Sequence, residues 1–440
     1  MCNMCSLVCP HSVLRPYLLT KEEYENAPKE VKEDAKEAKI KDNDLMFVLG
    51  VSVYDCTGCG LCANVCPTKA IIMQNNKARE LKKIEYLKNI SEKKVLTKDT
   101  IKGSQFIKPS FNYSGACAGC GETPYLKLLS QLFKDNLMIA NATGCSSIYG
   151  ASAPSNPWNV PWANSLFEDN AEFGLGIRLS EDYMKNRIKD LMKENKDRLN
   201  DHNKELIEEY INNYSKEVSF KVYNELDYND FKEIIPYKKY IKEKSIWLVG
   251  GDGWAYDIGF GGIDQVLSLN ENVNILVLDT EVYSNTGGQA SKSTRYGAIA
   301  KFATSGKQTS KKDLAKIAMT YPNVYVGTIS LGANPTHTIK TMLEAEKHNG
   351  PSLLIAYAPC IAHGIKTGMK DSIKEEKLAT NSGYFPLYRY NPSNKKFTLD
   401  SKADFDKLEE FYKRENRYKN GNLEKNKEDI IKKYEELSEN

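Results

Sequence analysis

The chain has 440 residues, of which 41% are hydrophobic and 27% charged, with a formal net charge of +3. This composition is typical of a globular protein with a buried core and excludes a wholly disordered chain. The near balance of 61 basic and 58 acidic residues gives no electrostatic case for a nucleic acid or an anionic membrane as partner. No apolar run reaches the roughly 18 residues of a membrane span. The N-terminus lacks a secretory signal pattern, so we expect a cytoplasmic protein.

Eleven cysteines are the most informative feature of the composition. A cytosolic chain keeps its thiols reduced, so clustered cysteines there indicate metal sites rather than a disulfide framework. Seven of them fall into two groups within the first 66 residues, and four lie further along the chain.

Residues 1–80 predict a small α+β ferredoxin-like domain. The apolar runs Leu45–Leu49 and Ala70–Met73 are short enough to be strands. Residues 21–43 are charged and predict a helical insertion. The apolar content is too low for an independent core, so bound metal must help to stabilise this domain.

The second cysteine group is a complete C-x2-C-x2-C-x3-C-P run, because residues 56–67 read CTGCGLCANVCP. Three thiolates at this spacing bind one 4Fe-4S cluster, and the cysteine before proline binds the other cluster of a two-cluster ferredoxin. A structural zinc site needs only four well-placed ligands and does not explain Pro67. The pattern therefore indicates iron–sulfur clusters.

The first group, Cys2, Cys5 and Cys9 before Pro10, matches only the last three cysteines of that pattern. Either a three-iron or otherwise ligated cluster forms there, or the chain is the C-terminal portion of a longer protein. A start inside a motif favours the second interpretation. Cross-ligation then gives a complete 4Fe-4S set, Cys9, Cys56, Cys59 and Cys62, and an incomplete set, Cys2, Cys5 and Cys66.

Residues 81–110 are charged and predict a linker, and residues 111–400 alternate in the α/β manner. Continuous apolar runs predict strands covered on both faces of a mainly parallel sheet. These runs are Leu137–Ala140, Ser245–Val249, Val273–Leu278, Val324–Gly327 and Ser352–Ala356, with a helical pattern over Pro335–Lys347. Residues 180–244 predict a charged helical insertion, and residues 401–440 a charged, solvated helical tail.

The four remaining cysteines are Cys117, Cys120, Cys145 and Cys360. Cys145 and Cys360 each follow a predicted strand, and parallel strands end at one edge of a sheet, so these thiols could meet there. Spacing alone leaves three alternatives open, namely a third cluster, a zinc site or separate buried thiols.

A glycine-rich turn, Val249–Trp254, ends a predicted strand and opens a helix. Such a turn lets backbone N–H groups approach a phosphate. Asp252 lies where a carboxylate could hold Mg²⁺ against a diphosphate, and Thr280 follows the next strand, 28 residues on. Two adjacent strand ends could thus supply a carboxylate, a hydroxyl and a carbonyl to one metal. The alternative is an ordinary connection with a helix-capping aspartate.

Together these segments resemble one family, the pyruvate:ferredoxin (flavodoxin) oxidoreductases, also called pyruvate synthases. The resemblance extends from Cys2 to about Gly364 and rests on several motifs. They are residues 56–67, GACAGCGETP at 115–124, TGC at 143–145, GDGW at 251–254, DTEVYSNTGG at 279–288, GANP at 332–335 and PCIAHG at 359–364. The implied fold is a mainly parallel α/β domain that binds thiamine diphosphate (TPP), preceded by the two-cluster ferredoxin-like domain.

The resemblance also implies roles for individual residues. A third 4Fe-4S cluster, beside TPP, would be held by Cys117, Cys120, Cys145 and Cys360. TPP would contact Glu122, Cys145, Gly251, Asp252, Gly253, Trp254, Thr280, Glu281, Val282, Tyr283, Ser284 and Asn285. Asp252, Thr280 and the Val282 carbonyl would bind Mg²⁺, and Asn285 would face the reacting carbon.

The implied activity is oxidative decarboxylation of pyruvate to acetyl-CoA and CO₂, with electrons passing one at a time through the clusters to ferredoxin or flavodoxin. Family enzymes have further domains that hold the aminopyrimidine half of TPP, and the sequence shows no such domain. We therefore expect a partial enzyme that needs the missing N-terminal portion and acts in a dimeric complex. The alternatives are a stand-alone iron–sulfur electron carrier and an inactive fragment of a disrupted gene. Motifs do not discriminate pyruvate from other 2-oxoacids.

Overall fold

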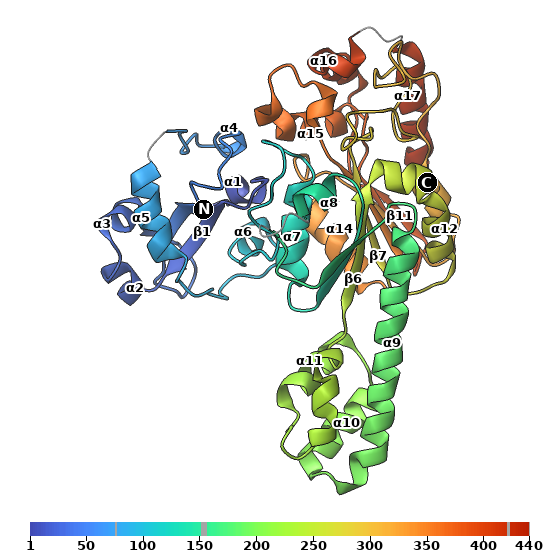
Figure 1. Cartoon of the computed structure of the whole chain (residues 1–440). Helices are drawn as coiled ribbons and strands as arrows, with labels where there is room; N and C mark the ends of the chain where they lie inside the picture. The colour runs from blue at the N-terminus through green and yellow to red at the C-terminus, as the bar shows by residue number, and fades with distance from the viewer. Residues whose placement is uncertain (75–76, 151–155, 420–422, 440) are drawn as a thin grey trace.

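The computed structural model describes residues 1–74, 77–150, 156–419 and 423–439. It comprises a small N-terminal part, a large α/β part and a helical projection from the latter (Figure 1). Within the described ranges, every helix is too short or too polar to cross a membrane.

The N-terminal part is built on a three-stranded antiparallel sheet in the order β1-β3-β2. Its strands are β1 (Leu14–Leu19), β2 (Lys36–Glu37) and β3 (Met46–Val51), and its helices are α1 (Met4–Leu7), α2 (Lys21–Glu25), α3 (Lys29–Asp34) and α4 (Leu61–Val65). The predicted strand at Leu45–Leu49 is present as β3. The strand predicted at Ala70–Met73 is wrong, because Ile72 and Met73 are exposed and this segment pairs with no strand in the described part of the chain. The 21–43 insertion is helical only in part, since it ends in β2.

The segment predicted as a linker, residues 81–110, is not free chain. Helix α5 (Lys77–Leu87) packs against β3 and buries Leu87, and α6 (Ile101–Ser104) packs against the first helix of the α/β part. These contacts tie the connecting segment to both parts of the protein.

An eight-stranded sheet forms the centre of the α/β part, in the order β11-β10-β8-β9-β7-β6-β4-β5. Its parallel strands are β4 (Leu137–Ala142), β5 (Trp162–Ser165), β6 (Ser245–Gly251), β7 (Asn274–Asp279), β8 (Tyr325–Ile329) and β9 (Ser352–Tyr357). All five predicted strands are present, and β5 and the antiparallel edge strands β10 (Tyr388–Asn391) and β11 (Lys396–Leu399) were not predicted.

Helices cover both faces of this sheet, which explains its continuous apolar strands. They are α7 (Thr123–Phe133), α8 (Cys145–Gly150), α12 (Phe260–Ser268), α13 (Leu314–Ala318), α14 (Pro335–Lys347) and α15 (Ser372–Asn381). In β6, Ile246 and Leu248 join the core on one face, while Trp247 and Val249 join the core on the other. The second core also takes in Leu7 from α1, so the N-terminal part packs directly on the α/β part.

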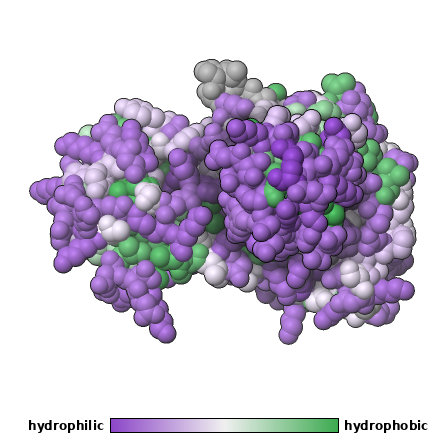
Figure 2. All heavy atoms as spheres, turned by 90° about the horizontal axis from the view of Figure 1, so that it is seen from below, coloured by the Kyte–Doolittle hydropathy of each residue, from purple (hydrophilic) through white to green (hydrophobic). Residues whose placement is uncertain are grey.

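The predicted 180–244 insertion is a projection with a core of its own, formed by α9 (Asn170–Asn195), α10 (Asp201–Asn212) and α11 (Lys216–Glu225) (Figure 1). Figure 2, viewed toward the end of this projection, shows a largely hydrophilic surface. In its described residues, the tail over 401–440 is helical as predicted, but it is not a solvated segment. Helices α16 (Leu408–Arg414) and α17 (Glu424–Ser438) bury Phe411 and Ile430 in the main core, because a few apolar residues at helical spacing suffice to dock an otherwise charged segment.

Candidate cofactor and cluster sites

The predicted metal ligands meet at the carboxyl edge of the central strands. Asp252 follows β6 and Thr280 follows β7, and these two strands are neighbours in the sheet. The Thr280 hydroxyl lies 3.0 Å from Oδ1 of Asp252 and 3.0 Å from the carbonyl oxygen of Val282. Three oxygens this close, from a carboxylate, a hydroxyl and a carbonyl, are a donor set that suits Mg²⁺.

Asp252 is 1% exposed, and its electrostatic environment favours a bound cation. Burial, followed by the nearby Asp279 carboxylate, raises the pKa of Asp252 well above its usual range. The Ser291 hydroxyl donates to its Oδ2 at 2.5 Å and holds the carboxyl in place. A divalent cation would relieve the repulsion between the two carboxylates, because the ion is the largest local charge in such a site.

Gly251 and Gly253 in this turn have different surroundings, so glycine has a different role at each position. A Cβ on Gly253 would lie 2.4 Å from the Tyr283 ring, so this position requires glycine for packing. A Cβ on Gly251 would meet only the Leu278 carbonyl oxygen, at 3.9 Å, so its backbone faces open space. An open backbone at the start of a helical turn, Gly253–Ile258, is an arrangement that admits a phosphate.

A cavity of about 90 Å³ brings together eleven of the twelve predicted TPP contacts. This volume is smaller than the ~300–1,000 Å³ that is typical of complete ligand pockets. The residues that line it are Glu122, Cys145, Gly251, Asp252, Gly253, Trp254, Thr280, Val282, Tyr283, Ser284 and Asn285, with Thr143, Gly144, Phe167 and Thr286 in addition.

The twelfth predicted contact, Glu281, does not line this cavity. Its backbone is left-handed, with φ of 58°, and its fully buried carboxylate pairs with Lys311 at 2.9 Å and Arg417 at 2.8 Å. These cations hold the pKa of Glu281 well below its usual range although burial acts in the opposite direction. Through these ion pairs, Glu281 holds the loop after Thr280 against the protein interior, and its side chain points away from the cavity.

Glu122 lies in the cavity as a buried carboxyl. Burial raises its pKa to about 7, and the Tyr149 hydroxyl donates to it at 2.8 Å. A carboxyl with a raised pKa takes up a proton more readily, and in its protonated form it can donate as well as accept a hydrogen bond. Tyr149 was not predicted, because only the turn between β4 and α8 brings it next to Glu122.

His363 is a second residue that the sequence did not single out. The backbone N–H of Cys360 points to Nδ1 of His363, at 3.4 Å, so Nε2 carries the proton and donates to the Thr280 carbonyl at 2.6 Å. Burial lowers the pKa of His363 to about 3, which keeps the ring neutral. The side chain therefore links the loop of a predicted cluster ligand to the loop of a predicted Mg²⁺ ligand.

The four later cysteines come together from three segments at the same edge of the sheet. The Cys117, Cys120 and Cys360 thiols all act electrostatically on Cys145. The Gly121 N–H donates to the Pro359 carbonyl at 3.1 Å, and a Cβ on Gly121 would lie 2.6 Å from that residue's nitrogen. The glycine therefore permits the close approach of the two loops that carry Cys120 and Cys360.

Backbone N–H groups point at these sulfurs, as expected around an iron–sulfur cluster. Glu122 N–H donates to Cys120 Sγ and Ala362 N–H to Cys360 Sγ, both at 3.4 Å. In the described residues, no three His, Cys, Asp or Glu side chains converge as ligands of a single metal ion. The assignment of these thiols as ligands of a third cluster stays a prediction.

The cysteine thiols of the N-terminal part act on one another electrostatically, mainly within the two predicted sets, although Cys5 also acts on Cys62. Burial raises the pKa of Cys62 to about 12, with further increases from Cys9 and Cys59. Burial likewise raises the pKa of Cys5 to about 11, with further increases from Cys2 and Cys66. A cavity of about 860 Å³ is lined by the complete predicted set, Cys9, Cys56, Cys59 and Cys62. The cavity is large enough for a cluster, so the residues fit that group, and cluster binding stays a prediction.

The two parts of the protein also meet beside these sites. The backbone N–H of Gly119, between Cys117 and Cys120, points to the Cys59 sulfur as a hydrogen-bond donor. The Asn64 side-chain amide, in α4, donates to the Lys370 carbonyl at 2.6 Å. The cysteine groups of the N-terminal and α/β parts are therefore adjacent.

Two family models match segments of the chain. The model described as thiamine pyrophosphate enzyme, C-terminal TPP binding domain, matches residues 237–356, and the 4Fe-4S dicluster domain model matches residues 1–70. With the arrangement at the sheet edge, they define the class as an iron–sulfur protein with a TPP-binding domain.

Relatives in three organisms specify the family. The chain is 46% identical, over 91% of its length, to the pyruvate:ferredoxin oxidoreductase of Moorella thermoacetica and to a pyruvate-flavodoxin oxidoreductase of Klebsiella pneumoniae. It is 42% identical, over 91% of its length, to the pyruvate dehydrogenase (NADP+) of Cryptosporidium parvum. It spans 37%, 36% and 24% of these proteins, respectively. The chain belongs to the pyruvate:ferredoxin (flavodoxin) oxidoreductase family and spans about a third of its bacterial relatives.

Proposed function

We propose that this chain supplies the electron-transfer and TPP-diphosphate-binding portion of an enzyme that oxidatively decarboxylates pyruvate to acetyl-CoA and CO₂. The observation that supports this most directly is one cavity shared by two kinds of site. Cys145, a predicted cluster ligand, lines the same cavity as Asp252 and Thr280. A cluster bound there would lie next to the cofactor and could accept its electrons singly.

TPP, when bound, supplies the nucleophilic carbon and stabilises the carbanion of decarboxylation. Asp252, Thr280 and the Val282 carbonyl would hold Mg²⁺ against the diphosphate. Glu122 would contact the cofactor, and Asn285 would face the reacting carbon. His363 positions the Thr280 carbonyl through its 2.6 Å hydrogen bond.

The cysteine groupings support three 4Fe-4S clusters in the complete enzyme. The set with Cys145 and Cys360 would be proximal to TPP, and the set with Cys9 and Cys62 would come next, since Gly119 adjoins Cys59. The incomplete set, Cys2, Cys5 and Cys66, would lie furthest along the path. Single electrons would leave to ferredoxin or flavodoxin, the acceptors in the names of the relatives.

The substrates and partners follow from the same proposal. Pyruvate is favoured over other 2-oxoacids because the relatives are named for it, and coenzyme A would accept the acetyl group. The 90 Å³ cavity and the lengths of the relatives support a further polypeptide that completes the cofactor site, within a dimeric complex.

Anaerobic reconstitution tests this proposal. The chain with iron, sulfide, Mg²⁺ and TPP should show 4Fe-4S spectra and Mg²⁺-dependent TPP binding, without decarboxylation. Adding the polypeptide that matches the rest of the relatives should give coenzyme A-dependent decarboxylation, which Cys360→Ser should abolish. A chain that binds neither clusters nor TPP would contradict the proposed function. Robust activity of the 440 residues alone would contradict the need for a second polypeptide.

A further inference from the structure

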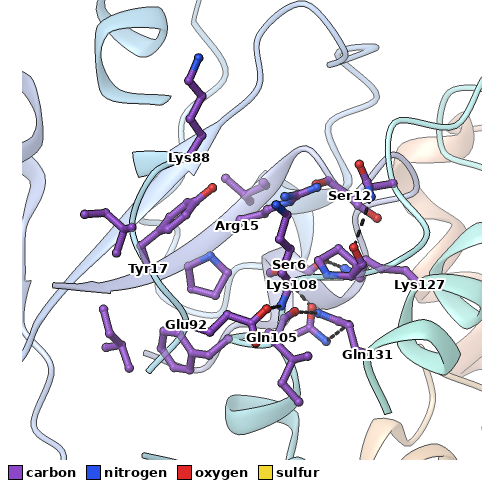
Figure 3. Close-up of a pocket in the computed structure, with 18 of the residues that line it drawn as sticks. Ser6, Ser12, Arg15, Tyr17, Lys88, Glu92, Gln105, Lys108, Lys127 and Gln131 are labelled. Atoms are coloured by element: carbon purple, nitrogen blue, oxygen red, sulfur yellow. Dashed lines mark hydrogen bonds between the residues drawn. The ribbon is translucent and has the colours of Figure 1, made fainter. Parts of the chain in front are cut away.

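A pocket of about 430 Å³ lies where the N-terminal part meets α7, and the proposed function gives it no role (Figure 3). Its volume falls in the ~300–1,000 Å³ range of ligand sites. Arg15 and Tyr17 of β1, Lys127 of α7 and Lys108 of the connecting segment line it. It shares no lining residue with the cavity that contains Asp252.

The pocket carries an excess of positive charge. Glu92 is its only acidic lining residue among the described part of the chain. That carboxylate is already engaged, since it lies 2.8 Å from the Lys134 ammonium and accepts the Lys108 backbone N–H at 2.9 Å. The cations of Arg15, Lys108 and Lys127 have no ion-pair partner within the described residues. Among the described residues that line the pocket, no unengaged carboxylate therefore remains to pair with these cations.

These cations also retain unused hydrogen-bond donors. Arg15 donates through Nε to the Ser12 carbonyl at 2.9 Å, and its buried Nη2 has no partner. Lys127 is 1% exposed and donates to the Ser6 carbonyl. Lys108 lines the same pocket as Arg15 and Lys127 (Figure 3). Of the three cations, Lys127 is buried, Arg15 is partly exposed and Lys108 is exposed. An anion between them would gain charge-assisted hydrogen bonds from the free donors.

Three polar side chains of the pocket, Ser6, Gln105 and Gln131, hydrogen-bond to one another. The Ser6 hydroxyl donates to Gln105 Oε1 at 2.9 Å, and Gln105 Nε2 donates to Gln131 Oε1 at 3.0 Å. Because the two amides hydrogen-bond to each other, the cationic side chains are the main groups available to bind a ligand. The Arg15 guanidinium is further fixed over the Tyr113 ring, 4.9 Å from its centroid. A planar guanidinium held in this way is preorganised for a phosphate.

We propose that this pocket binds a phosphate group, either free or as part of a nucleotide, between Arg15, Lys108 and Lys127. Three cations match a dianion better than a single carboxylate. The Tyr17 ring and the volume beyond the cations would accommodate the rest of a nucleotide.

Binding here would act on the neighbouring clusters, a consequence that rests on the proposed function. Lys127 separates the pocket from the N-terminal cysteines, because the Ser6 carbonyl it contacts follows Cys5, and Cys9 acts on its ammonium electrostatically. A bound phosphate would offset the positive charge of Lys127. Reduction adds negative charge to a cluster, so the cluster would become harder to reduce when phosphate is present.

Calorimetric titration of the reconstituted chain with inorganic phosphate and with ADP tests this inference. Wild type should bind phosphate saturably, and Arg15→Gln and Lys108→Gln should each weaken it at least tenfold, with cluster content and melting temperature unchanged. Lys88→Gln is the matched control, since Figure 3 shows its amine pointing away from the pocket. Tighter binding of ADP would identify a nucleotide as the source, and equal binding would identify the phosphate group alone.

The inference is overturned if wild type binds neither probe, or if Lys88→Gln weakens binding as much as Arg15→Gln. Failure of the proposed function would look different. Clusters or TPP would then fail to bind, while phosphate binding in the pocket would persist.

Discussion

Replacing Asp252 by asparagine should stabilise the metal-free protein and abolish cofactor binding. The carboxyl is buried, lies near Asp279 and has a pKa well above its usual range. Asparagine keeps the shape and can still pair with Ser291 and Thr280, which contact the two carboxyl oxygens at 2.5 and 3.0 Å. The change therefore removes an ionisable group that the metal-free fold disfavours and that Mg²⁺ requires.

The sign follows from linkage. The folded pKa of Asp252 is raised above the unfolded value of ~3.9, so its contribution to stability is lost as pH rises from about 4 through the raised pKa. Asparagine avoids this loss. We expect Asp252→Asn to gain about 1–3 kcal/mol in the free energy of unfolding at neutral pH, the usual penalty for a poorly compensated buried polar group.

Ligand binding should act in the opposite direction. Mg²⁺ and TPP at 100 times the wild-type Kd should stabilise wild type by about 2.7 kcal/mol. At ~2–4 °C per kcal/mol, that is a rise in Tm of about 5–10 °C. Asp252→Asn should show no such rise.

Thermal unfolding with and without Mg²⁺ and TPP measures both effects. Asp400→Asn is the control, because Arg389 at 2.9 Å and His337 at 3.1 Å hold the pKa of Asp400 below its usual range. That variant should lose stability and keep the cofactor-induced rise. An equal cofactor-induced rise in Asp252→Asn and wild type would refute the assignment of this loop.

Three further predictions follow from the geometry. Cys360→Ser should lose one cluster's worth of iron and sulfide while TPP still binds; unchanged stoichiometry by iron and sulfide analysis would argue against a cluster at this thiol. Gly121→Ala should lower the free energy of unfolding by about 1–3 kcal/mol, since its Cβ would lie 2.6 Å from Pro359; denaturant titration checks this. His363 has a pKa lowered to about 3, so its stabilising contribution should be lost as pH falls from about 6.5 toward 3, and His363→Gln should flatten that profile in denaturant titrations.

The motifs predicted to bind metal and phosphate could be recognised from local spacing. The C-x2-C-x2-C-x3-C-P run and the turn at Asp252 carry their chemistry within about a dozen residues, because ligand geometry and backbone approach are local requirements. The pairing of Asp252 with Thr280 was also predictable, since one strand–helix–strand passage places both at the same sheet edge. The five apolar strands were found for a related reason, namely their burial on both faces.

Residues whose roles depend on distant partners could not be found in this way. Glu281 stands inside a recognisable motif, yet its carboxylate turns from the cavity toward Arg417, 136 residues away. His363 follows a predicted cluster ligand, but only the folded sheet edge places its Nε2 against the Thr280 carbonyl. Edge strands such as β10 and the docked helix α16 carry too few apolar residues to be distinguished from charged surface segments.

The sequence by itself indicated the types of candidate ligand and the segments that carry them, since cysteines, a carboxylate and glycines at fixed spacing are local properties of the chain. The tertiary structure decided which side chains share a cavity and which compensate one another. It turned Glu281 toward cations, placed Nε2 of His363 against the Thr280 carbonyl, and gathered Arg15, Lys108 and Lys127 around one pocket. Burial, charge balance and hydrogen-bond satisfaction depend on contacts between residues far apart in sequence, so they exist only once the chain is folded.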